Sequence, residues 1–316
     1  MNRLLAIALA LMAWPALAFD LQGHRGARGL LPENTLPSFQ RALELGVTTL
    51  ELDIAVTKDG VLVISHDPAL NPDLTRDASG RFLERGGPAI SSITWAQLQT
   101  YDVGRIKPGT EYARKFPDQQ PLDGTRIPRL ADLFDLVKRS GDGQVRFAIE
   151  TKLVPDKPDE TLAPEPFARA VVDEIRKAGM EARSQILSFD WRSLQVVQKI
   201  APEIPTVYLT IQRRFDNIAA DRPEGSRWTA GFQFRDHGSV PRMIKAAAGS
   251  YWSVFFADLD TQKLKEAQSL GLKVLVWTVN DPAVMARMID SGVDGLITDR
   301  PDLARQLLEE RKIRWR

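Results

Sequence analysis

Short apolar runs alternate with longer stretches in helical spacing along most of this sequence, and this alternation constrains the fold more than any other feature. The runs expected to form strands are 145–149, 185–189, 206–210, 251–256, 273–279 and 295–298. The stretches expected to form helices are 131–139, 166–178, 191–200, 262–270, 282–290 and 301–311. Two earlier strands, at 21–25 and 49–57, bring the count to eight, which favours an α/β fold of the (β/α)8 TIM barrel type. A doubly wound open sheet would alternate in the same way and stays open as an alternative.

Local signals mark several helix ends. Asp281 immediately precedes Pro282, and Asp299 comes shortly before Pro301, which is typical of a capping residue followed by a proline in the first turn. Glycine tolerates the left-handed backbone that often ends a helix. It stands at three of the expected helix ends: Gly179, Gly271 and Gly292.

Residues 68–127 do not follow the alternation. This polar stretch, rich in Gly and Pro, contains one expected short helix, which a Thr94-x-x-Gln97 capping box would open. A connection of this length is predicted to be an insertion over the mouth of the barrel. Its aromatic residues either line a substrate pocket or, more commonly, give a small subdomain its own core. They are Trp95, Tyr101, Tyr112 and Phe116.

Potential catalytic groups gather around the second expected strand. An Asp59-Gly60 pair between apolar runs predicts a two-residue hairpin turn. Counting outward from that turn places Asp53 opposite His66 on the partner strand. Because side chains alternate along a strand, Glu51 projects from the same face as Asp53. The hairpin therefore predicts that two acids and a histidine converge.

Glu51, Asp53 and Glu150 offer three carboxylates from two neighbouring strands. Hard oxygen ligands of this kind suit Ca²⁺ or Mg²⁺ rather than a soft metal. Without a cation, three converging anions would raise one another's pKa values. The alternative is a salt-bridge network in which Arg25 and Lys152 compensate the charge.

Arg25 and Lys152 beside such a site are suited to an anion such as phosphate. His24 and His66, two of the three histidines, stand at expected strand ends beside the carboxylates. A histidine pair can supply the general acid and base that ester cleavage requires. In a barrel, active sites form at the C-terminal ends of the strands. The residues expected there are His24, Glu51, Asp53, Glu150, Lys152, Trp277 and Asp299.

Other polar residues give weaker signals. Ser65, Ser188 and Asp67 would allow a hydrolase triad, but no Gly-x-Ser-x-Gly elbow occurs, and the nearby carboxylates fit a metal better. His237 has no comparable partners in sequence and is expected to be a capping or surface residue.

The first residues resemble a secretory signal peptide, 1–18, with Arg3, an apolar run at 4–14 and a small-residue cleavage site at 16–18. The apolar run is shorter than the roughly 20 residues that span a bilayer, so we expect no stable membrane insertion. The mature chain, 19–316, would be a single domain in the bacterial periplasm or outside the cell. It contains no cysteine, which excludes disulfides and thiolate chemistry. The chain has 42 basic and 41 acidic residues, so no net charge directs it to nucleic acid.

These motifs occur in an order and spacing that closely resemble the glycerophosphodiester phosphodiesterase family, over about 23–302. The matching elements are His24-Arg25-Gly26, Pro32-Glu33-Asn34-Thr35, Glu51-Leu52-Asp53, Asp59-Gly60, His66-Asp67, Ile127-Pro128, Glu150-Thr151-Lys152, Ser188-Phe189, Trp277-Thr278-Val279-Asn280 and 295–301. One departure follows the insertion. Where the family usually has Pro-Thr-Leu-Glu-Glu, this chain has Pro128-Arg129-Leu130-Ala131-Asp132, and the extra arginine bears on the expected leaving-group pocket.

The resemblance implies a barrel of the phosphodiesterase/phospholipase C type, with 68–127 as the insertion characteristic of the family. It assigns Ca²⁺ or Mg²⁺ binding to Glu51, Asp53 and Glu150, acid and base catalysis to His24 and His66, phosphate binding to Arg25 and Lys152, the glycerol side of the pocket to Trp277, and support of ligands or loops to Glu33 and Asn34.

The implied activity is metal-dependent hydrolysis of a small-molecule glycerophosphodiester to sn-glycerol 3-phosphate and an alcohol. One alternative is a lysophospholipase D or phospholipase C type activity on lysolipids, which would need an apolar lip at the barrel mouth. The other is a catalytically inactive phosphodiester-binding protein. The presence of both histidines and all three acids disfavours the inactive protein. The sequence indicates no oligomeric state.

Overall fold

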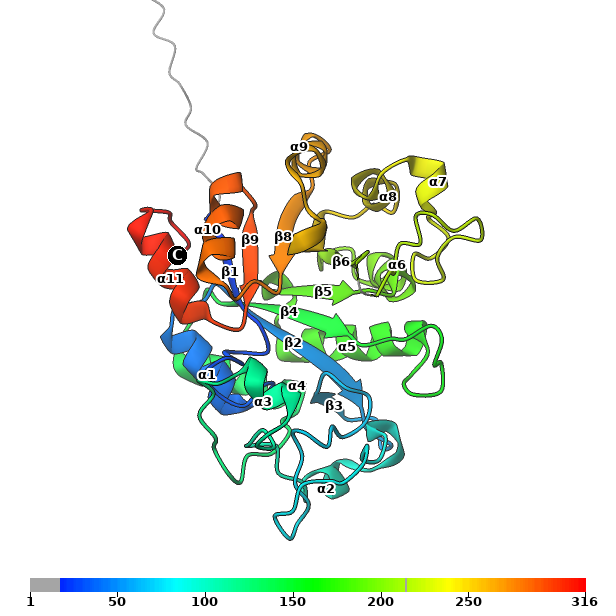
Figure 1. Ribbon diagram of the computed structural model, residues 1–316. Helices are drawn as coiled ribbons and strands as arrows, with labels where there is room; N and C mark the ends of the chain where they lie inside the picture. Colours follow the sequence, from blue (N-terminus) through cyan, green and yellow to red (C-terminus); the bar gives the residue numbers. More distant parts are fainter. Residues whose placement is uncertain (1–17, 214) are drawn as a thin grey trace, which may run out of the picture.

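The computed structural model describes residues 18–213 and 215–316 and places eight parallel strands in a closed barrel (Figure 1). The barrel strands are β1 (Asp20–Gly23), β2 (Thr49–Val56), β4 (Arg146–Thr151), β5 (Ser184–Ser188), β6 (Thr206–Thr210), β7 (Tyr251–Phe255), β8 (Lys273–Trp277) and β9 (Gly295–Thr298). β1 pairs with β9 on one side and with β2 on the other, which closes the sheet. The expected (β/α)8 barrel is therefore confirmed, and the open doubly wound sheet is excluded.

An α-helix follows each barrel strand and packs on the outside. These helices are α1 (Leu36–Glu44), α4 (Leu130–Ser140), α5 (Pro164–Ala178), α6 (Trp191–Ile200), α8 (Val240–Ala246), α9 (Thr261–Ser269), α10 (Pro282–Ser291) and α11 (Pro301–Glu310). The six helices expected from the spacing are all present, whereas α1, α8 and the short α7 (Phe234–His237) were not predicted. No helix among the described residues is long and apolar enough to cross a bilayer. The predicted leader, except Ala18, lies outside the described residues.

Most of the predicted helix-end signals are confirmed, with one correction. Asp281 caps α10 by accepting a hydrogen bond from the backbone N–H of Val284. Gly179 and Gly292 take the left-handed conformation after their helices, and Gly271 has a φ of +77° just beyond α9. Asp299, however, does not cap α11. Its carboxylate instead binds His24, Arg28 and Asn280 in the barrel mouth.

The hairpin after β2 also corrects a prediction. β3 (Leu62–Ile64) pairs with β2 so that Ile64 faces Ile54, one residue away from the expected register. The backbone carbonyl of Asp53 therefore accepts from the N–H of Ser65, not His66. The turn contains a third residue, with Gly60 at a φ of +80°, because Thr57 already pairs with Val61. His66 lies beyond the end of β3, so strand alternation does not fix the direction of its side chain.

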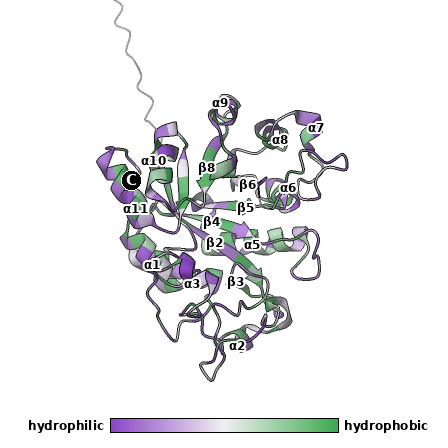
Figure 2. Cartoon of the chain, viewed as in Figure 1, coloured by the Kyte–Doolittle hydropathy of each residue, from purple (hydrophilic) through white to green (hydrophobic). Residues whose placement is uncertain are grey.

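The core has separate layers on the two faces of the barrel wall. Leu50, Leu52 and Ile54 of β2 point outward and join the main hydrophobic cluster beneath the helices. A smaller cluster, which includes Leu187 and Leu275, fills the barrel interior. Figure 2 shows hydrophobic residues along strands such as β8 and hydrophilic residues on outer segments such as α3 and α7. At the C-terminal ends of the strands, the inward-facing positions carry the polar groups described below.

The insertion packs against the β2–β3 hairpin and contains a 3₁₀ turn η1 (Ile90–Ser92), α2 (Trp95–Leu98) and α3 (Glu111–Lys115). The predicted Thr94–Gln97 capping box opens α2, whereas α3 was not predicted. Leu70, Ile90 and Leu98 belong to a satellite core that also includes residues of the hairpin, and Trp95 and Tyr101 pack against it. Two of the four aromatic residues therefore serve the subdomain core. Tyr112 and Phe116 point elsewhere.

Candidate active site

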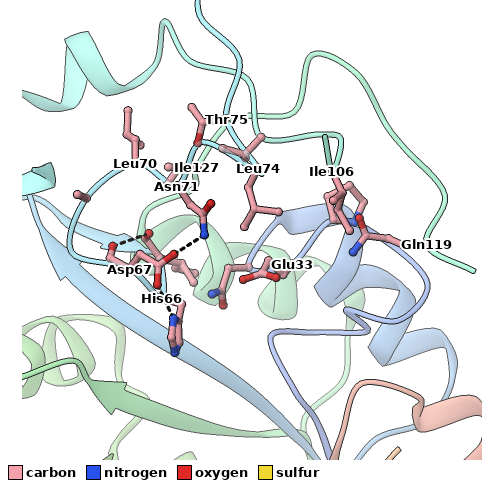
Figure 3. Close-up of a pocket in the computed structure, with 16 residues that line it drawn as sticks. Glu33, His66, Asp67, Leu70, Asn71, Leu74, Thr75, Ile106, Gln119 and Ile127 are labelled. Carbon is pink, nitrogen blue, oxygen red and sulfur yellow. Dashed lines mark hydrogen bonds and ion pairs between the residues drawn. The ribbon is translucent and has the colours of Figure 1, made fainter. Parts of the chain in front are cut away.

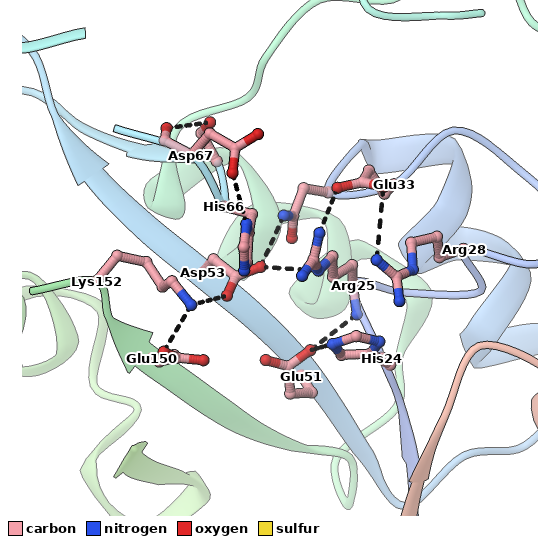
Figure 4. Close-up of polar contacts among 12 residues, drawn as sticks. His24, Arg25, Arg28, Glu33, Glu51, Asp53, His66, Asp67, Glu150 and Lys152 are labelled. Atoms are coloured by element: carbon pink, nitrogen blue, oxygen red, sulfur yellow. Dashed lines mark hydrogen bonds and ion pairs between the residues drawn. The ribbon is translucent and has the colours of Figure 1, made fainter. Parts of the chain in front are cut away.

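Three carboxylates converge at the C-terminal end of β2 and β4. Glu51 and Asp53 share the inner face of β2, and the parallel register places Glu150 of β4 beside Asp53. One oxygen from each residue lies within 4.8 Å of the other two, and all three residues are buried. Figure 4 shows them close together, with His66 above Asp53 and His24 beside Glu51. These are hard oxygen ligands, of the kind that bind Ca²⁺ or Mg²⁺.

The electrostatics of this group favour a bound cation. Burial raises the pKa of Glu51 well above its usual value, and the neighbouring Asp53 and Glu150 raise it further. Burial also raises the pKa of Glu150 to about 7. One oxygen of Asp53, Oδ1, is buried without a hydrogen-bond partner. A divalent cation would satisfy this oxygen and the excess negative charge together, so the residues present fit a metal.

Arg25 and Lys152 compensate only part of that charge. Lys152 Nζ lies 2.7 Å from Glu150 Oε1 and 3.6 Å from Asp53 Oδ1. Arg25 Nε lies 3.2 Å from Asp53 Oδ2. Burial opposes ionisation of Asp53, but Arg25 and its other polar neighbours hold the pKa of this carboxyl below its usual value. Because the pKa values of Glu51 and Glu150 stay raised, these cations alone do not account for the cluster.

The loop after β1 is fixed by Glu33 and Asn34, the two residues expected to support it. Glu33 Oε1 accepts a hydrogen bond from Arg25 NH1 at 2.6 Å. Asn34 donates from Nδ2 to Asp53 Oδ2 at 3.0 Å. The backbone N–H of Arg25 donates to Glu51 Oε2 at 2.9 Å, and both Arg25 and Asn34 have positive φ. This tight loop brings the guanidinium of Arg25 against the carboxylates.

Both predicted histidines lie at this centre. His24 Nδ1 is 2.7 Å from Asp299 Oδ1, and His24 Nε2 is 3.8 Å from Glu51 Oε2. His66 Nδ1 is 2.8 Å from Asp67 Oδ1. Burial lowers the pKa of both imidazoles, and that of His24 falls to about 4, with nearby Arg28 lowering it further. In each histidine a carboxylate engages Nδ1, which leaves Nε2 for proton transfer.

A cavity of about 140 Å³ in the barrel mouth is lined by both histidines, by Glu51 and Glu150, and by Arg25 and Lys152. Its apolar side includes Trp277, the last residue of β8, and Phe189, whose ring lies edge-to-face with the indole at 5.4 Å. A second cavity of about 40 Å³ lies between the barrel and the insertion (Figure 3). His66 borders both cavities, and the second also contains Asp67, Asn71 and Gln119.

The sequence reasoning missed two residues at this centre. Arg28 lines the main cavity and donates to both oxygens of Asp299, which was expected at the barrel mouth and also as a capping residue. Tyr112 of α3 donates from its hydroxyl to Glu33 Oε2. Arg28 follows the His24-Arg25-Gly26 motif closely, so its position in the loop was a usable signal. No local pattern could have linked Tyr112 to a residue 79 positions earlier.

The remaining candidates lie elsewhere. His237 lies in α7, with its ring 6.2 Å from that of Phe232. Ser188 donates to the backbone carbonyl of Thr151, and Ser65 donates to that of Asp67, so these hydroxyls support local backbone. Arg129 pairs with Asp132 and lies over Trp95 on the insertion side. It lines neither of the two cavities.

Comparisons with known proteins agree with this geometry. The model of the glycerophosphoryl diester phosphodiesterase family matches residues 24–303. A glycerophosphodiester phosphodiesterase of Caldanaerobacter subterraneus is 29% identical over 279 residues, which is 88% of this chain and 93% of the relative.

Solved structures extend the likeness to the fold. A structure from Silicibacter pomeroyi, provisionally named a glycerophosphoryl diester phosphodiesterase, has a TM-score of 0.84 and 35% identity, and the match covers 96% of this chain and 97% of that one. A phosphodiesterase from Oleispira antarctica, solved with the product sn-glycerol-3-phosphate, shares the fold at a TM-score of 0.67 and 21% identity. That match covers 92% of this chain and 97% of the other.

Proposed function

The chain belongs to the glycerophosphoryl diester phosphodiesterase family, and we propose that it hydrolyses glycerophosphodiesters to sn-glycerol 3-phosphate and an alcohol. One observation carries this proposal. Two of the three clustered carboxylates, Glu51 and Glu150, line a single cavity at the barrel mouth together with three cationic side chains and two carboxylate-anchored histidines, and Asp53 lies directly against them. The sn-glycerol-3-phosphate in the Oleispira antarctica structure supports the choice of product.

Glu51, Asp53 and Glu150 would hold Ca²⁺ or Mg²⁺. When bound, the cation would supply a Lewis acid that draws charge from the phosphoryl oxygens. Lys152 presents a point charge to the same phosphate, and Arg25, held by Glu33 and Asp53, adds a fixed guanidinium.

His24 and His66 would divide the proton transfers between them. The Nε2 of one imidazole takes the proton of the nucleophile, and the other gives a proton to the departing alkoxide. Asp299 and Asp67 hold the two rings by Nδ1, so each ring presents one defined nitrogen to the substrate. Trp277 and Phe189 would close the glycerol side and limit the access of water.

We also propose that the protein is exported and that residues 1–18 are removed. The leader pattern and the lack of cysteine support this location. Phe19 is buried and donates its backbone N–H to the carbonyl of Arg314, and β1 starts at the next residue, so the barrel proper begins where the leader would end. N-terminal sequencing of protein from the periplasmic fraction should return Phe19. A chain that kept Met1 would contradict this location.

Product analysis tests the activity. The protein should release sn-glycerol 3-phosphate from glycerophosphocholine, glycerophosphoethanolamine or diglycerol phosphate. A chelator should abolish turnover, and added Ca²⁺ or Mg²⁺ should restore it. Glu150→Gln keeps the volume but removes an anionic ligand, so metal affinity should fall about tenfold or more. Undiminished turnover in chelator would exclude the metal assignment.

One observation favours lysolipids as a second class of substrate. Four aromatic rings form a strip that begins at the cavity, with Trp277 packed on Phe189, Phe189 on Phe215 and Phe215 on Trp228. Phe215, the third ring from the cavity, is 42% exposed, whereas Trp228 beyond it is buried. Phe215 offers the apolar lip that an acyl chain on the glycerol would need.

The two substrate classes can be separated by kinetics. Phe215→Ala should lower kcat/KM on a short-chain lysophosphatidylcholine about fivefold and leave glycerophosphocholine within twofold. Leu122→Ala removes an exposed apolar side chain from the insertion and serves as the control. If the unaltered protein turns over glycerophosphocholine but no lysolipid, the second class is excluded and the first stands.

A further inference from the structure

Arg28 joins the insertion to the barrel mouth. On the barrel side, its guanidinium donates from Nε and NH2 to the two oxygens of Asp299, at 2.7 and 3.0 Å. On the insertion side, Cζ lies 4.6 Å from the centre of the Phe116 ring, and NH1 donates to the hydroxyl of Tyr112 at 3.4 Å. The side chain is only 11% exposed. Figure 4 shows Arg28 beside Glu33, with the imidazole of His24 nearby.

Arg28 fixes the orientation of the Asp299 carboxylate. This carboxylate accepts hydrogen bonds from His24 Nδ1, from Arg28 Nε and NH2, and from Asn280 Nδ2 at 2.6 Å. A carboxylate has about four positions for donors, so this one is fully occupied and its plane is fixed. Loss of Arg28 would remove two of the four donors. The carboxylate could then rotate, and the imidazole of His24 would rotate with it.

The insertion is bound to the same loop at further points beside α3. Gln119 Nε2 donates to the backbone carbonyl of Arg28 at 2.7 Å. The N–H of Gln120 donates to the carbonyl of Leu30 at 2.9 Å. Arg300, next to Asp299, forms an ion pair with Asp118 at 2.7 Å. Both the backbone and the side chain of Arg28 are therefore held by the segment that carries Tyr112 and Phe116.

We propose that Arg28 is a positioning residue for His24, and that α3 of the insertion holds Arg28 in place through Tyr112 and Phe116. The insertion then contributes to the reaction through Arg28 and Asp299 without touching the substrate. This inference rests on the proposed function for its kinetic test, but its structural test does not.

The main variant is Arg28→Gln, and Arg192→Gln is its matched control. Arg192 also donates from Nε and NH2 to a fully buried aspartate, Asp190, but it lies on α6 away from His24. Displacing a catalytic group slightly can cost about 100-fold in rate. We therefore expect Arg28→Gln to lower kcat 10- to 100-fold with KM within threefold, and Arg192→Gln to leave both constants within twofold. Phe116→Ala should lower kcat less, about fivefold.

A double-mutant cycle separates positioning from general structural damage. If Arg28 acts through His24, then Arg28→Gln should change the residual rate of His24→Ala by less than twofold. Equal losses in both backgrounds would contradict the proposal, as would an unchanged kcat in Arg28→Gln. Arg28→Lys, which keeps the charge but not the two-point contact, should recover only part of the rate.

Nuclear magnetic resonance gives a readout that needs no substrate. The chain has three histidines, so the Nδ1–H resonance of His24 can be assigned by its absence from His24→Ala. It should exchange slowly with solvent in the unaltered protein and in Arg192→Gln, and rapidly in Arg28→Gln. Slow exchange in Arg28→Gln would overturn the inference. If the unaltered protein hydrolyses no glycerophosphodiester, the proposed function fails, and this resonance still decides the role of Arg28.

Discussion

The two histidines of the cavity are anchored alike but in opposite surroundings. Both bind an aspartate through Nδ1. The side chains of His24 and Asp299 are 12% and 2% exposed, whereas those of His66 and Asp67 are 34% and 38% exposed. Asp299 also binds a buried arginine and Asn280, while the other carboxylate oxygen of Asp67 accepts from Asn71 alone.

This difference follows from the elements that carry the two pairs. His24 and Asp299 follow β1 and β9, which are neighbouring barrel strands held in register by backbone hydrogen bonds. His66 and Asp67 follow β3, outside the barrel, where the chain enters the insertion. Barrel strands therefore fix the position of His24 and Asp299, whereas a hairpin and a loop fix the position of His66 and Asp67. Both histidines should therefore be needed for the reaction. His24 should tolerate a change in its anchoring aspartate less well than His66.

The largest effects are expected when either imidazole is removed. His24→Ala and His66→Ala should each lower turnover roughly 100- to 10,000-fold, the usual contribution of a positioned acid or base. His237→Ala should stay within a few-fold, because His237 lies on α7 with its ring beside that of Phe232 and lines neither cavity. Steady-state rates on glycerophosphocholine at saturating Ca²⁺ would measure all three. A loss in His237→Ala as large as in the others would show that the site is incomplete.

The order and type of the barrel elements could be predicted because hydrophobic spacing and helix ends are local signals. The convergence of Glu51, Asp53 and Glu150 was predictable for a related reason, since strand alternation and a parallel register follow from the barrel. The partner of His66 in the hairpin was not predictable. Adding one residue to a turn shifts the register of the whole hairpin, and Gly60 fits a two- or a three-residue turn.

The contacts that cross from the insertion to the barrel carried no usable signal. Tyr112 forms hydrogen bonds with Glu33 and Arg28, which lie far earlier in the sequence. In the sequence, Tyr112 cannot be distinguished from Trp95, another aromatic residue of the polar insertion, which packs against the satellite core. Asp299 was correctly expected at the barrel mouth, but it was also wrongly predicted to cap a helix, because an acid shortly before a first-turn proline commonly does so. Its partners His24, Arg28 and Asn280 are 275, 271 and 19 residues away. Long-range polar contacts of this kind need the fold before they can be seen.

The contrast between the two anchoring aspartates can be tested directly. Asp299→Asn removes the charge opposite buried Arg28, so it should cost roughly 3 to 5 kcal/mol in the free energy of unfolding and about 100-fold in kcat. Asp67→Asn keeps an acceptor at a half-exposed position and should cost about 1 kcal/mol or less and at most about tenfold in kcat. Urea denaturation and initial rates measure both. Equal penalties for the two variants would remove the distinction drawn between the pairs.

The carboxylates between the two histidines should make stability depend on pH in the metal-free protein. The pKa of Glu150 is about 7 in the folded state, against an ordinary value of 4.5. Between these values the folded protein binds more protons than the unfolded chain, so this group lowers stability as pH rises from about 4.5 to about 7. The fall should amount to a few kcal/mol and then level off.

The unaltered protein must be compared with Glu150→Gln, because the lowered pKa of His24 acts in the opposite direction over part of this range. The difference in unfolding free energy between the two proteins, measured in chelator from pH 4 to pH 8, isolates the carboxyl group. Saturating Ca²⁺ should abolish or reverse the fall between about pH 4.5 and pH 7, since only the folded protein offers the complete site. A difference that does not vary with pH would mean that Glu150 ionises normally.

The smallest effect is expected at Trp277, which supports neither histidine. Its indole N–H donates to the carbonyl of Ser253, and its ring packs on Phe189 and Phe255, so it forms a wall of the cavity without reaching the carboxylates. Trp277→Ala should therefore raise KM about fivefold through lost apolar contact and leave kcat within twofold, which is the pattern for binding that is equal in the ground and transition states. Metal affinity should not change.

Trp277→Ala also tests whether the cavity wall affects the two histidines, because it opens the cavity to water without altering Asp299 or Asp67. If kcat fell with KM unchanged, Trp277 would be fixing the position of His24 or His66. If only the stability of the protein fell, Trp277 would be a core residue of the barrel.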